Sequence, residues 1–110
     1  MGLWVGKPRL KNGERLEWKK NANRQQGPIR AVGGRLYLTN ERLIFSPNRV
    51  DRITRGESWQ TSLTEITEIG LESTGLRKRL SVAAGENTDL FVVNSPGECV
   101  NRIRNALEST

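Results

Sequence analysis

The residues best suited to chemistry in this sequence are two groups of cations. They are Lys19, Lys20 and Arg24 in the first group and Arg49, Arg52 and Arg55 in the second. Clustered lysine and arginine side chains bind phosphates through charge-assisted hydrogen bonds, and arginine can make two such bonds in parallel. Beside an anionic membrane each exposed cation contributes about 1 kcal/mol, which salt weakens. The alternative is that these side chains are solvated and that Asp51 and Glu57 pair with some of them.

The residue types present in the sequence do not favour catalysis. The chain has no histidine, the usual general base near neutral pH, and its single cysteine cannot form a zinc site. Cys99 falls among apolar residues at helical spacing, where a buried, inert thiol is expected rather than a nucleophile. Gly33 and Gly34 enter a strand rather than a helix, so backbone freedom at a strand start explains them better than a phosphate-binding loop. We therefore expect no enzyme activity, metal or cofactor.

Composition indicates one small domain over residues 1–110, with residues 1–9 as an N-terminal extension. The sequence contains neither a signal peptide nor an apolar stretch of the roughly 20 residues that span a bilayer. We expect a soluble, cytoplasmic protein, and a lone cysteine fits a reducing compartment. The oligomeric state stays open.

Positive charge is concentrated in the first half of the chain. Residues 1–60 hold 13 Lys and Arg against 5 Asp and Glu, a net charge of +8, whereas residues 61–110 hold 5 against 7, a net charge of −2. This asymmetry favours an anionic partner, either lipid headgroups, nucleic acid or an acidic protein. Nucleic acid is the least favoured, because nearly all aromatic residues fall at strand positions, where packing rather than base stacking is expected.

The stretch from Gly33 to Pro47 predicts a β-hairpin. With Asn40 and Glu41 as a two-residue loop, the facing pairs are Thr39 and Arg42, Leu38 and Leu43, Tyr37 and Ile44, and Leu36 and Phe45. The four leucine and phenylalanine side chains then share one face, which predicts the core side of the hairpin. Tyr37 and Ile44 lie on the other face, which we expect to be partly covered.

Other strands follow from alternation of apolar and polar residues. We expect a half-buried first strand over residues 15–20 with Leu16 and Trp18 on one face, and then polar loops over residues 21–28 and 47–56. Three further stretches also read as strand. The apolar residues of the first are Trp59, Leu63, Ile69 and Leu71, those of the second are Leu80 and Val82, and those of the third run from Leu90 to Val93. A bend near Thr64 restores the alternation, and the last stretch is expected to be buried on both faces.

A C-terminal helix is predicted over residues 95–108. Ser95 and Glu98 have the spacing of a capping box, with Pro96 at the first helical position. Five residues then form one apolar stripe: Cys99, Val100, Ile103, Ala106 and Leu107. About seven strands and one helix predict a mainly β, α+β domain: an antiparallel sandwich or open barrel capped by the helix.

Several motifs resemble the GRAM domain, a member of the pleckstrin-homology-like superfamily. The resemblance lies in Gly34, the leucine-rich strand, Thr39, Asn40, and the Arg42 to Phe45 run, and more weakly in residues 10–14 and 62–69. It implies a seven-stranded antiparallel fold with a C-terminal helix, and a non-enzymatic module that binds phosphoinositides, other anionic lipids or proteins. The motif residues themselves look structural, since Thr39, Asn40 and Arg42 shape a turn.

The resemblance also implies where the two cation groups lie. Loops after the first and third strands share one rim in this fold, which would bring the cations of residues 19–24 and 49–55 together. We therefore expect peripheral association with an anionic membrane surface. The alternative is a protein-interaction adaptor with no lipid role, using a sheet edge or the face that carries Tyr37 and Ile44.

Overall fold

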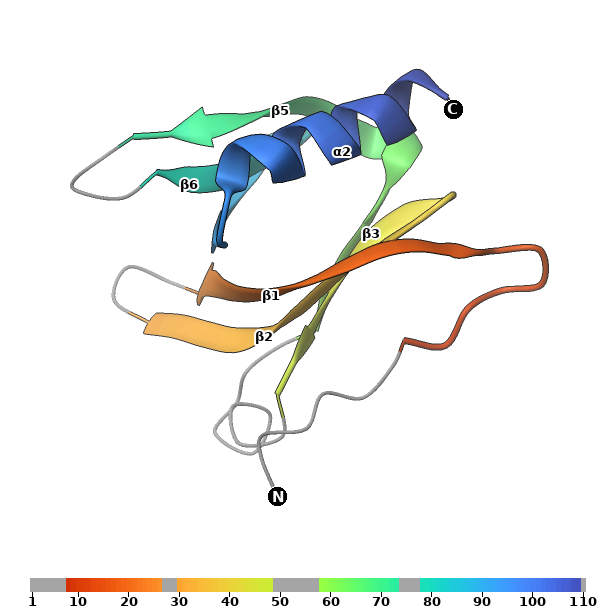
Figure 1. Ribbon diagram of the computed structural model, residues 1–110, viewed down its shortest axis with the longest axis horizontal. Helices are drawn as coiled ribbons and strands as arrows, with labels where there is room; N and C mark the ends of the chain where they lie inside the picture. Colours follow the sequence, from red (N-terminus) through yellow and green to blue (C-terminus); the bar gives the residue numbers. More distant parts are fainter. Residues whose placement is uncertain (1–7, 27–29, 49–57, 74–77, 110) are drawn as a thin grey trace.

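The structure is a computed structural model that describes residues 8–26, 30–48, 58–73 and 78–109. These residues form one antiparallel sheet of seven strands and a C-terminal helix, α2 (Figure 1). The strands are β1 (Leu16–Gln26), β2 (Arg30–Thr39), β3 (Arg42–Pro47), β4 (Trp59–Ser62), β5 (Ile66–Glu72), β6 (Arg79–Ala84) and β7 (Asn87–Val92). A 3-10 turn, η1 (Leu63–Glu65), follows β4, and α2 spans Pro96–Glu108. The predicted mainly β architecture is confirmed.

The strands follow the order β4-β3-β2-β1-β7-β6-β5, so β1 joins the two halves of the sheet. Its pairing with β2 is long, but it meets β7 only at Asn23 opposite Val92 and at Arg24 opposite Phe91. Helix α2 lies alongside β5 and β6 and contacts both (Figure 1). No helix among the described residues is long and apolar enough to cross a membrane.

The predicted hairpin is confirmed with its register. Leu36 pairs with Phe45, Tyr37 with Ile44, and Leu38 with Leu43. The leucine and phenylalanine side chains belong to one buried core, as the alternation predicted. The turn is closed by Thr39, whose hydroxyl oxygen accepts hydrogen bonds from the backbone N–H groups of Glu41 at 3.0 Å and Arg42 at 2.9 Å.

The apolar stripe of α2 packs against this core as predicted. Cys99, Val100 and Ile103 are buried, and Ala106 and Leu107 pack against the core while remaining partly exposed. The capping box, however, does not form. Ser95 adopts a left-handed backbone conformation (φ 52°), and its side chain makes no capping bond. Its carbonyl oxygen instead accepts hydrogen bonds from the N–H groups of Glu98 and Cys99.

Strand β1 differs from the prediction in length and in face. It continues to Gln26, so most of the predicted loop over residues 21–28 is strand paired with β2. The polar run misled because Ala22 fills the inner face while Asn21 and Asn23 are exposed on the other. A bulge lies between Leu16 and Trp18, so these two side chains do not share a face.

Of three smaller predictions, one is confirmed and two are wrong. The bend near Thr64 is confirmed as η1, between β4 and β5. Leu71 does not continue the buried row, since it remains 43% exposed on the edge strand β5. The last strand is not buried on both faces, because Leu90 and Val92 are only half-buried.

Gly34 lies inside β2 rather than at a strand start, so backbone freedom does not account for it. A Cβ at this position would clash with the carbonyl oxygen of Ser46 and lie 2.8 Å from the Cα of Pro47. Glycine is needed here because β2 and β3 approach too closely for any side chain.

Candidate anion-binding surface

The three described cations of the predicted site project from one strand rather than from a loop. Lys19 pairs with Tyr37 on the outer face of the β1–β2 hairpin, where it is exposed. Lys20 and Arg24 lie on the opposite face with buried Ala22, because successive side chains of a strand alternate. The positive charge of Lys20 acts to lower the pKa of Cys99, although burial dominates and raises it. Lys19 therefore faces away from its two partners.

Arg24 is held in place by other residues. Its Nη2 donates to Asp89 Oδ1 at 2.9 Å, both side chains being less than one fifth exposed. Its guanidinium also lies 6.0 Å from the ring centroid of Trp59, within reach of a cation–π interaction. Arg24 thus joins β1, β4 and β7, and most of its charge is already neutralised.

The space beside Arg24 is not a strongly positive site. A cavity of about 480 Å³ lies there between β4 and the β6–β7 turn. Among the described residues that line it are three carboxylates, those of Glu65, Glu86 and Asp89, and one cation, Arg24. Like charges repel, so this cavity disfavours an anion.

The second cation group lies outside the described residues: Arg49, Arg52 and Arg55. The flanks of that segment are described. The N–H group of Asn48 donates to the carbonyl oxygen of Gly33 at 2.8 Å, and Trp59 pairs with Phe45 where the chain returns. Both flanks therefore lie toward the end of the hairpin where β1 passes into β2. The convergence of the two cation groups stays a prediction, because the second group lies outside the described residues.

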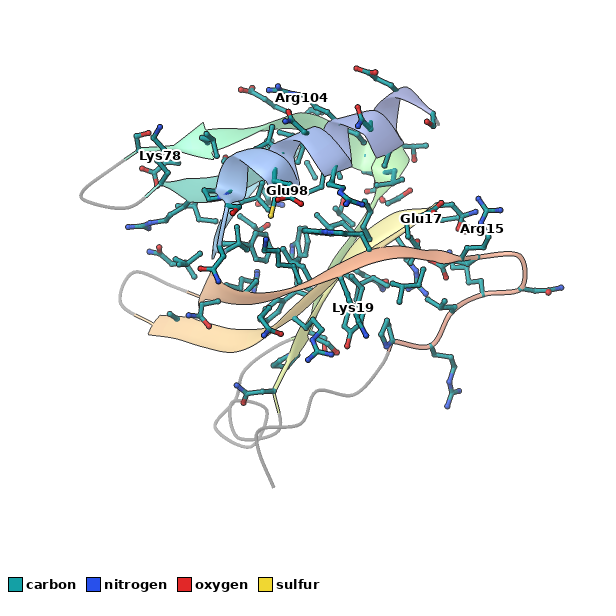
Figure 2. The ribbon with its side chains drawn as sticks, in the orientation of Figure 1. Arg15, Glu17, Lys19, Lys78, Glu98 and Arg104 are labelled. Atoms are coloured by element: carbon teal, nitrogen blue, oxygen red, sulfur yellow. The ribbon has the colours of Figure 1, made fainter. Side chains whose placement is uncertain are left out.

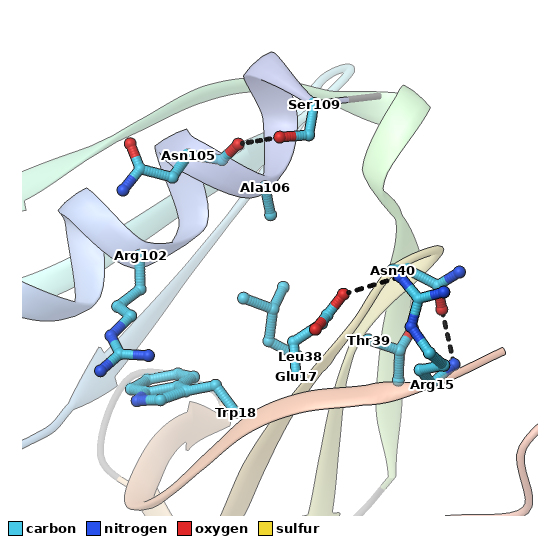
Figure 3. Close-up of a pocket in the computed structure, with 10 residues that line it drawn as sticks. All are labelled: Arg15, Glu17, Trp18, Leu38, Thr39, Asn40, Arg102, Asn105, Ala106 and Ser109. Carbon is cyan, nitrogen blue, oxygen red and sulfur yellow. Dashed lines mark hydrogen bonds and ion pairs between the residues drawn. The ribbon is translucent and has the colours of Figure 1, made fainter.

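A groove beside α2 has mixed charge (Figure 3). Its volume is about 520 Å³, and Trp18, Leu38 and Ala106 supply its apolar lining. Figure 3 shows the guanidinium of Arg102 directed toward the Trp18 ring. Arg15 and Glu17 on its rim pair at 3.4 Å in an exposed position, so the groove offers little net charge.

The residues of the sequence motif form a buried network instead of a ligand site. The Glu14 side chain is fully buried and accepts four hydrogen bonds: from Thr39 Oγ1 at 2.6 Å, Arg42 Nε at 2.8 Å, Arg42 Nη2 at 2.9 Å and the Lys11 N–H at 2.9 Å. These donors, Arg42 above all, lower the pKa of Glu14 to about 2. Asn40 Oδ1 accepts from the N–H group of Arg15 at 2.6 Å. The motif therefore fixes residues 9–15 to the hairpin.

Among the described residues, the cysteine and the possible metal ligands lack the features that reactive sites require. Cys99 is buried and its pKa is raised by burial, so the reactive thiolate is disfavoured. No group of three or more metal-ligating side chains occurs in the described ranges. Figure 2 shows charged side chains distributed over the surface, with Lys78 near the β5–β6 loop and Lys19 near β1 and β2.

Sequence comparisons find no matching family model and no matching curated protein. Solved structures do match. The N-terminal PH domain of Vps36 has a TM-score of 0.68 and 21% identity, covering 94% of this chain and 86% of that one. A C-terminal domain from Leishmania infantum, described as an unknown protein, has a TM-score of 0.69 and 18% identity, covering 87% and 86%. The N-terminal PH domain of human ARAP2 has a TM-score of 0.62 and 14% identity, covering 94% and 87%. The chain therefore has the fold of a pleckstrin-homology (PH) domain.

Proposed function

We propose that this chain is a non-catalytic binding module of the GRAM type that associates peripherally with the anionic cytoplasmic face of a membrane. The observation that carries the proposal is unpaired positive charge on the β1–β2 hairpin. Over residues 16–39 there are five Lys and Arg and one Glu. Lys19 and Lys20 have no ion-pair partner within the described part of the chain.

The segment of residues 49–57 adds to this charge. It contains Arg49, Arg52 and Arg55 against Asp51 and Glu57, a net charge of +1. Its described flanks lie next to β2 and close to Arg24, which supports a common basic surface. Arg24 contributes least because Asp89 already neutralises it. At about 1 kcal/mol per cation near the membrane, the remaining five give weak, salt-sensitive binding.

The PH-like fold agrees with this role, since modules of this fold bind lipids or proteins. The mechanism is Coulombic attraction followed by arginine–phosphate hydrogen bonds. No phosphate pocket is described, so we expect the membrane's charge density to matter more than the identity of a headgroup.

Co-sedimentation with vesicles tests the proposal. The purified chain is mixed with vesicles of phosphatidylcholine alone, or with 30% phosphatidylserine, at low and near-physiological salt. We expect binding only to the anionic vesicles and a decrease with salt. A triple variant, Arg49→Glu, Arg52→Glu and Arg55→Glu, should abolish it.

A charge-matched control separates a site from general attraction. Arg15, Lys78 and Arg102 are exposed and lie on other elements, so their triple change to Glu alters net charge equally. This control should retain most binding. Equal loss in both variants would reduce the proposal to non-specific attraction, and binding unaffected by either triple change would refute it.

A further inference from the structure

The outer face of the β1–β2 hairpin carries a second, smaller site. It is a pocket of about 110 Å³ lined by Pro8, Leu10, Leu16, Lys19, Arg35 and Tyr37. Leu10 is 37% exposed and Leu16 is 43% exposed, and they are two of the three large hydrophobic residues that the described chain exposes. Both side chains line the same pocket, so exposed apolar surface is concentrated there.

The bulge in β1 brings Leu16 to this face. Trp18 pairs with Leu38 and points to the core, whereas Leu16 pairs with Thr39 because Glu17 is the extra residue between them. Without the bulge, alternation would place Leu16 beside Trp18 on the inner face. Bulges that redirect a side chain are common beside functional sites.

The wall that carries Leu10 is fixed by the Glu14 network. Arg42 Nη2 donates to the carbonyl oxygen of Arg9 at 2.8 Å. The N–H group of Lys11 donates to Glu14 Oε1, and the N–H group of Glu14 donates to the carbonyl oxygen of Lys11 at 3.0 Å. The backbone groups of both neighbours of Leu10 are therefore held by hydrogen bonds, so its side chain is exposed on a preorganised segment.

Tyr37 supplies an independent sign of a ligand. The residue is 1% exposed, and its buried hydroxyl has no hydrogen-bond partner among the described residues. Buried polar atoms are nearly always satisfied, because an unsatisfied one costs roughly 1–3 kcal/mol. The other described side chains that line the pocket, those of Pro8, Leu10, Leu16, Lys19 and Arg35, offer no hydrogen-bond acceptor, so a ligand that brings one would satisfy this hydroxyl.

The charge of the pocket is positive. Within the described chain Lys19 is exposed without an ion pair, and Arg35 Nε donates to the neutral amide oxygen of Asn21 at 3.1 Å. None of the described residues that line the pocket carries a carboxylate. The site thus combines aliphatic walls, two cations and a buried donor.

We propose that this pocket binds an acidic peptide segment of a partner protein. An aliphatic side chain of the peptide lies against Leu10 and Leu16, and a neighbouring carboxylate binds Lys19 and Arg35. A peptide carbonyl or carboxylate oxygen accepts the hydrogen bond of the Tyr37 hydroxyl. This interaction shares Lys19 with the membrane association proposed above, but it also depends on Leu10, Leu16 and the Tyr37 hydroxyl, which that association does not use.

Size and polarity favour a peptide over lipid. Sites for whole small ligands usually measure about 300–1,000 Å³, so this pocket fits one side chain of a larger partner. A lipid tail entering the pocket would leave the Tyr37 hydroxyl unsatisfied, since hydrocarbon accepts no hydrogen bond.

Amide chemical-shift titrations of the full chain test the proposal. The probe is a pool of synthetic eight-residue peptides with central Leu or Ile flanked by Asp and Glu. One control pool replaces the acidic residues with Lys, and another replaces the aliphatic residues with Ser. We expect saturable shifts around Leu10, Leu16 and Tyr37 with the first pool alone. Absence of such shifts at millimolar peptide would overturn the proposal.

Variants then assign the contacts. Lys19→Glu with Arg35→Glu should weaken binding more than tenfold, whereas the charge-matched pair Lys78→Glu with Arg102→Glu should leave it unchanged. Tyr37→Phe removes only the hydroxyl, so it should fold at least as stably and bind about two- to tenfold more weakly. Equal weakening by both charge pairs, or full affinity in Tyr37→Phe, would contradict the assignment.

Vesicle binding by the same variants distinguishes this site from the membrane surface. Tyr37→Phe changes no charge, so it should weaken peptide binding while retaining vesicle binding, and the Arg49, Arg52 and Arg55 variant should do the reverse. Vesicle binding lost in Tyr37→Phe, with no response to peptides, would assign the pocket to lipid and refute the peptide proposal.

Discussion

Replacing Glu14 with Gln is the most direct test of how the motif residues stabilise this fold. Glutamine keeps the shape of the side chain but removes its charge. Four donors converge on the carboxylate, and Arg42 makes two of the bonds. After the change, the amide NH₂ group also faces a guanidinium, which has no acceptor to offer. We therefore expect a marked loss of stability without loss of the fold.

The magnitude follows from the pKa of Glu14. A shift from 4.5 to about 2 corresponds to about 3 kcal/mol, at 1.36 kcal/mol per unit. Arg42 is partly exposed, which allows some solvent screening. We expect Glu14→Gln to lower the free energy of unfolding by about 2 kcal/mol at pH 7, or the melting temperature by about 8 °C.

The effect should depend on pH with a defined sign. The folded-state pKa of Glu14 is lowered, so its stabilising contribution is fully present above the unfolded-state pKa of about 4.3 and is lost as pH falls toward about 2. About half of the difference between wild type and Glu14→Gln should disappear between pH 7 and pH 3.

Urea unfolding followed by tryptophan fluorescence, at pH 7 and at pH 3, measures both quantities. Glu17→Gln is the matched control, because Glu17 pairs with Arg15 at 3.4 Å on the surface and should cost less than about 0.5 kcal/mol. A Glu14→Gln effect no larger than that of the control, or one that stays constant from pH 7 to pH 3, would refute the reasoning.

Two further predictions concern packing. Gly34→Ala should destabilise the chain by about 3 kcal/mol, because the new methyl group meets the backbone of β3. Gly70→Ala is the control: its Cβ has open space around it, so stability should change by less than about 1 kcal/mol. Thermal unfolding compares the two variants, and equal effects would contradict the close approach of β2 and β3. The Cys99 thiol, buried and with a raised pKa, should react with Ellman's reagent at pH 8 only as the chain unfolds. Rapid labelling of the native protein would show that the apolar face of α2 is not packed against the core.

Local periodicity was sufficient for much of the fold. The alternation from Leu36 to Phe45 fixed the hairpin register, because a one-residue slip would have moved four apolar side chains from core to solvent. The stripe beginning at Cys99 likewise predicted α2 and its buried face, since helical spacing determines which side chains share a side. These features depend on neighbours within a few residues.

The Glu14 network and the Arg24–Asp89 pair depend on residues far apart in the chain. Glu14 meets Arg42 across 28 positions, and Arg24 meets Asp89 across 65. No spacing rule connects such residues, so a cation predicted to bind a ligand was found to be holding three strands together.

Sequence alone therefore determined the hairpin, the helix with its buried face and the excess of positive charge, because each is a property of short stretches or of composition. Tertiary structure decided which charges are unpaired and which way each side chain points. The bulge after Leu16 shows the difference: one extra residue in β1 reverses the face of that side chain, and only pairing with β2 reveals it. The proposed outer pocket exists for that reason, since Leu16 reaches it only through the bulge.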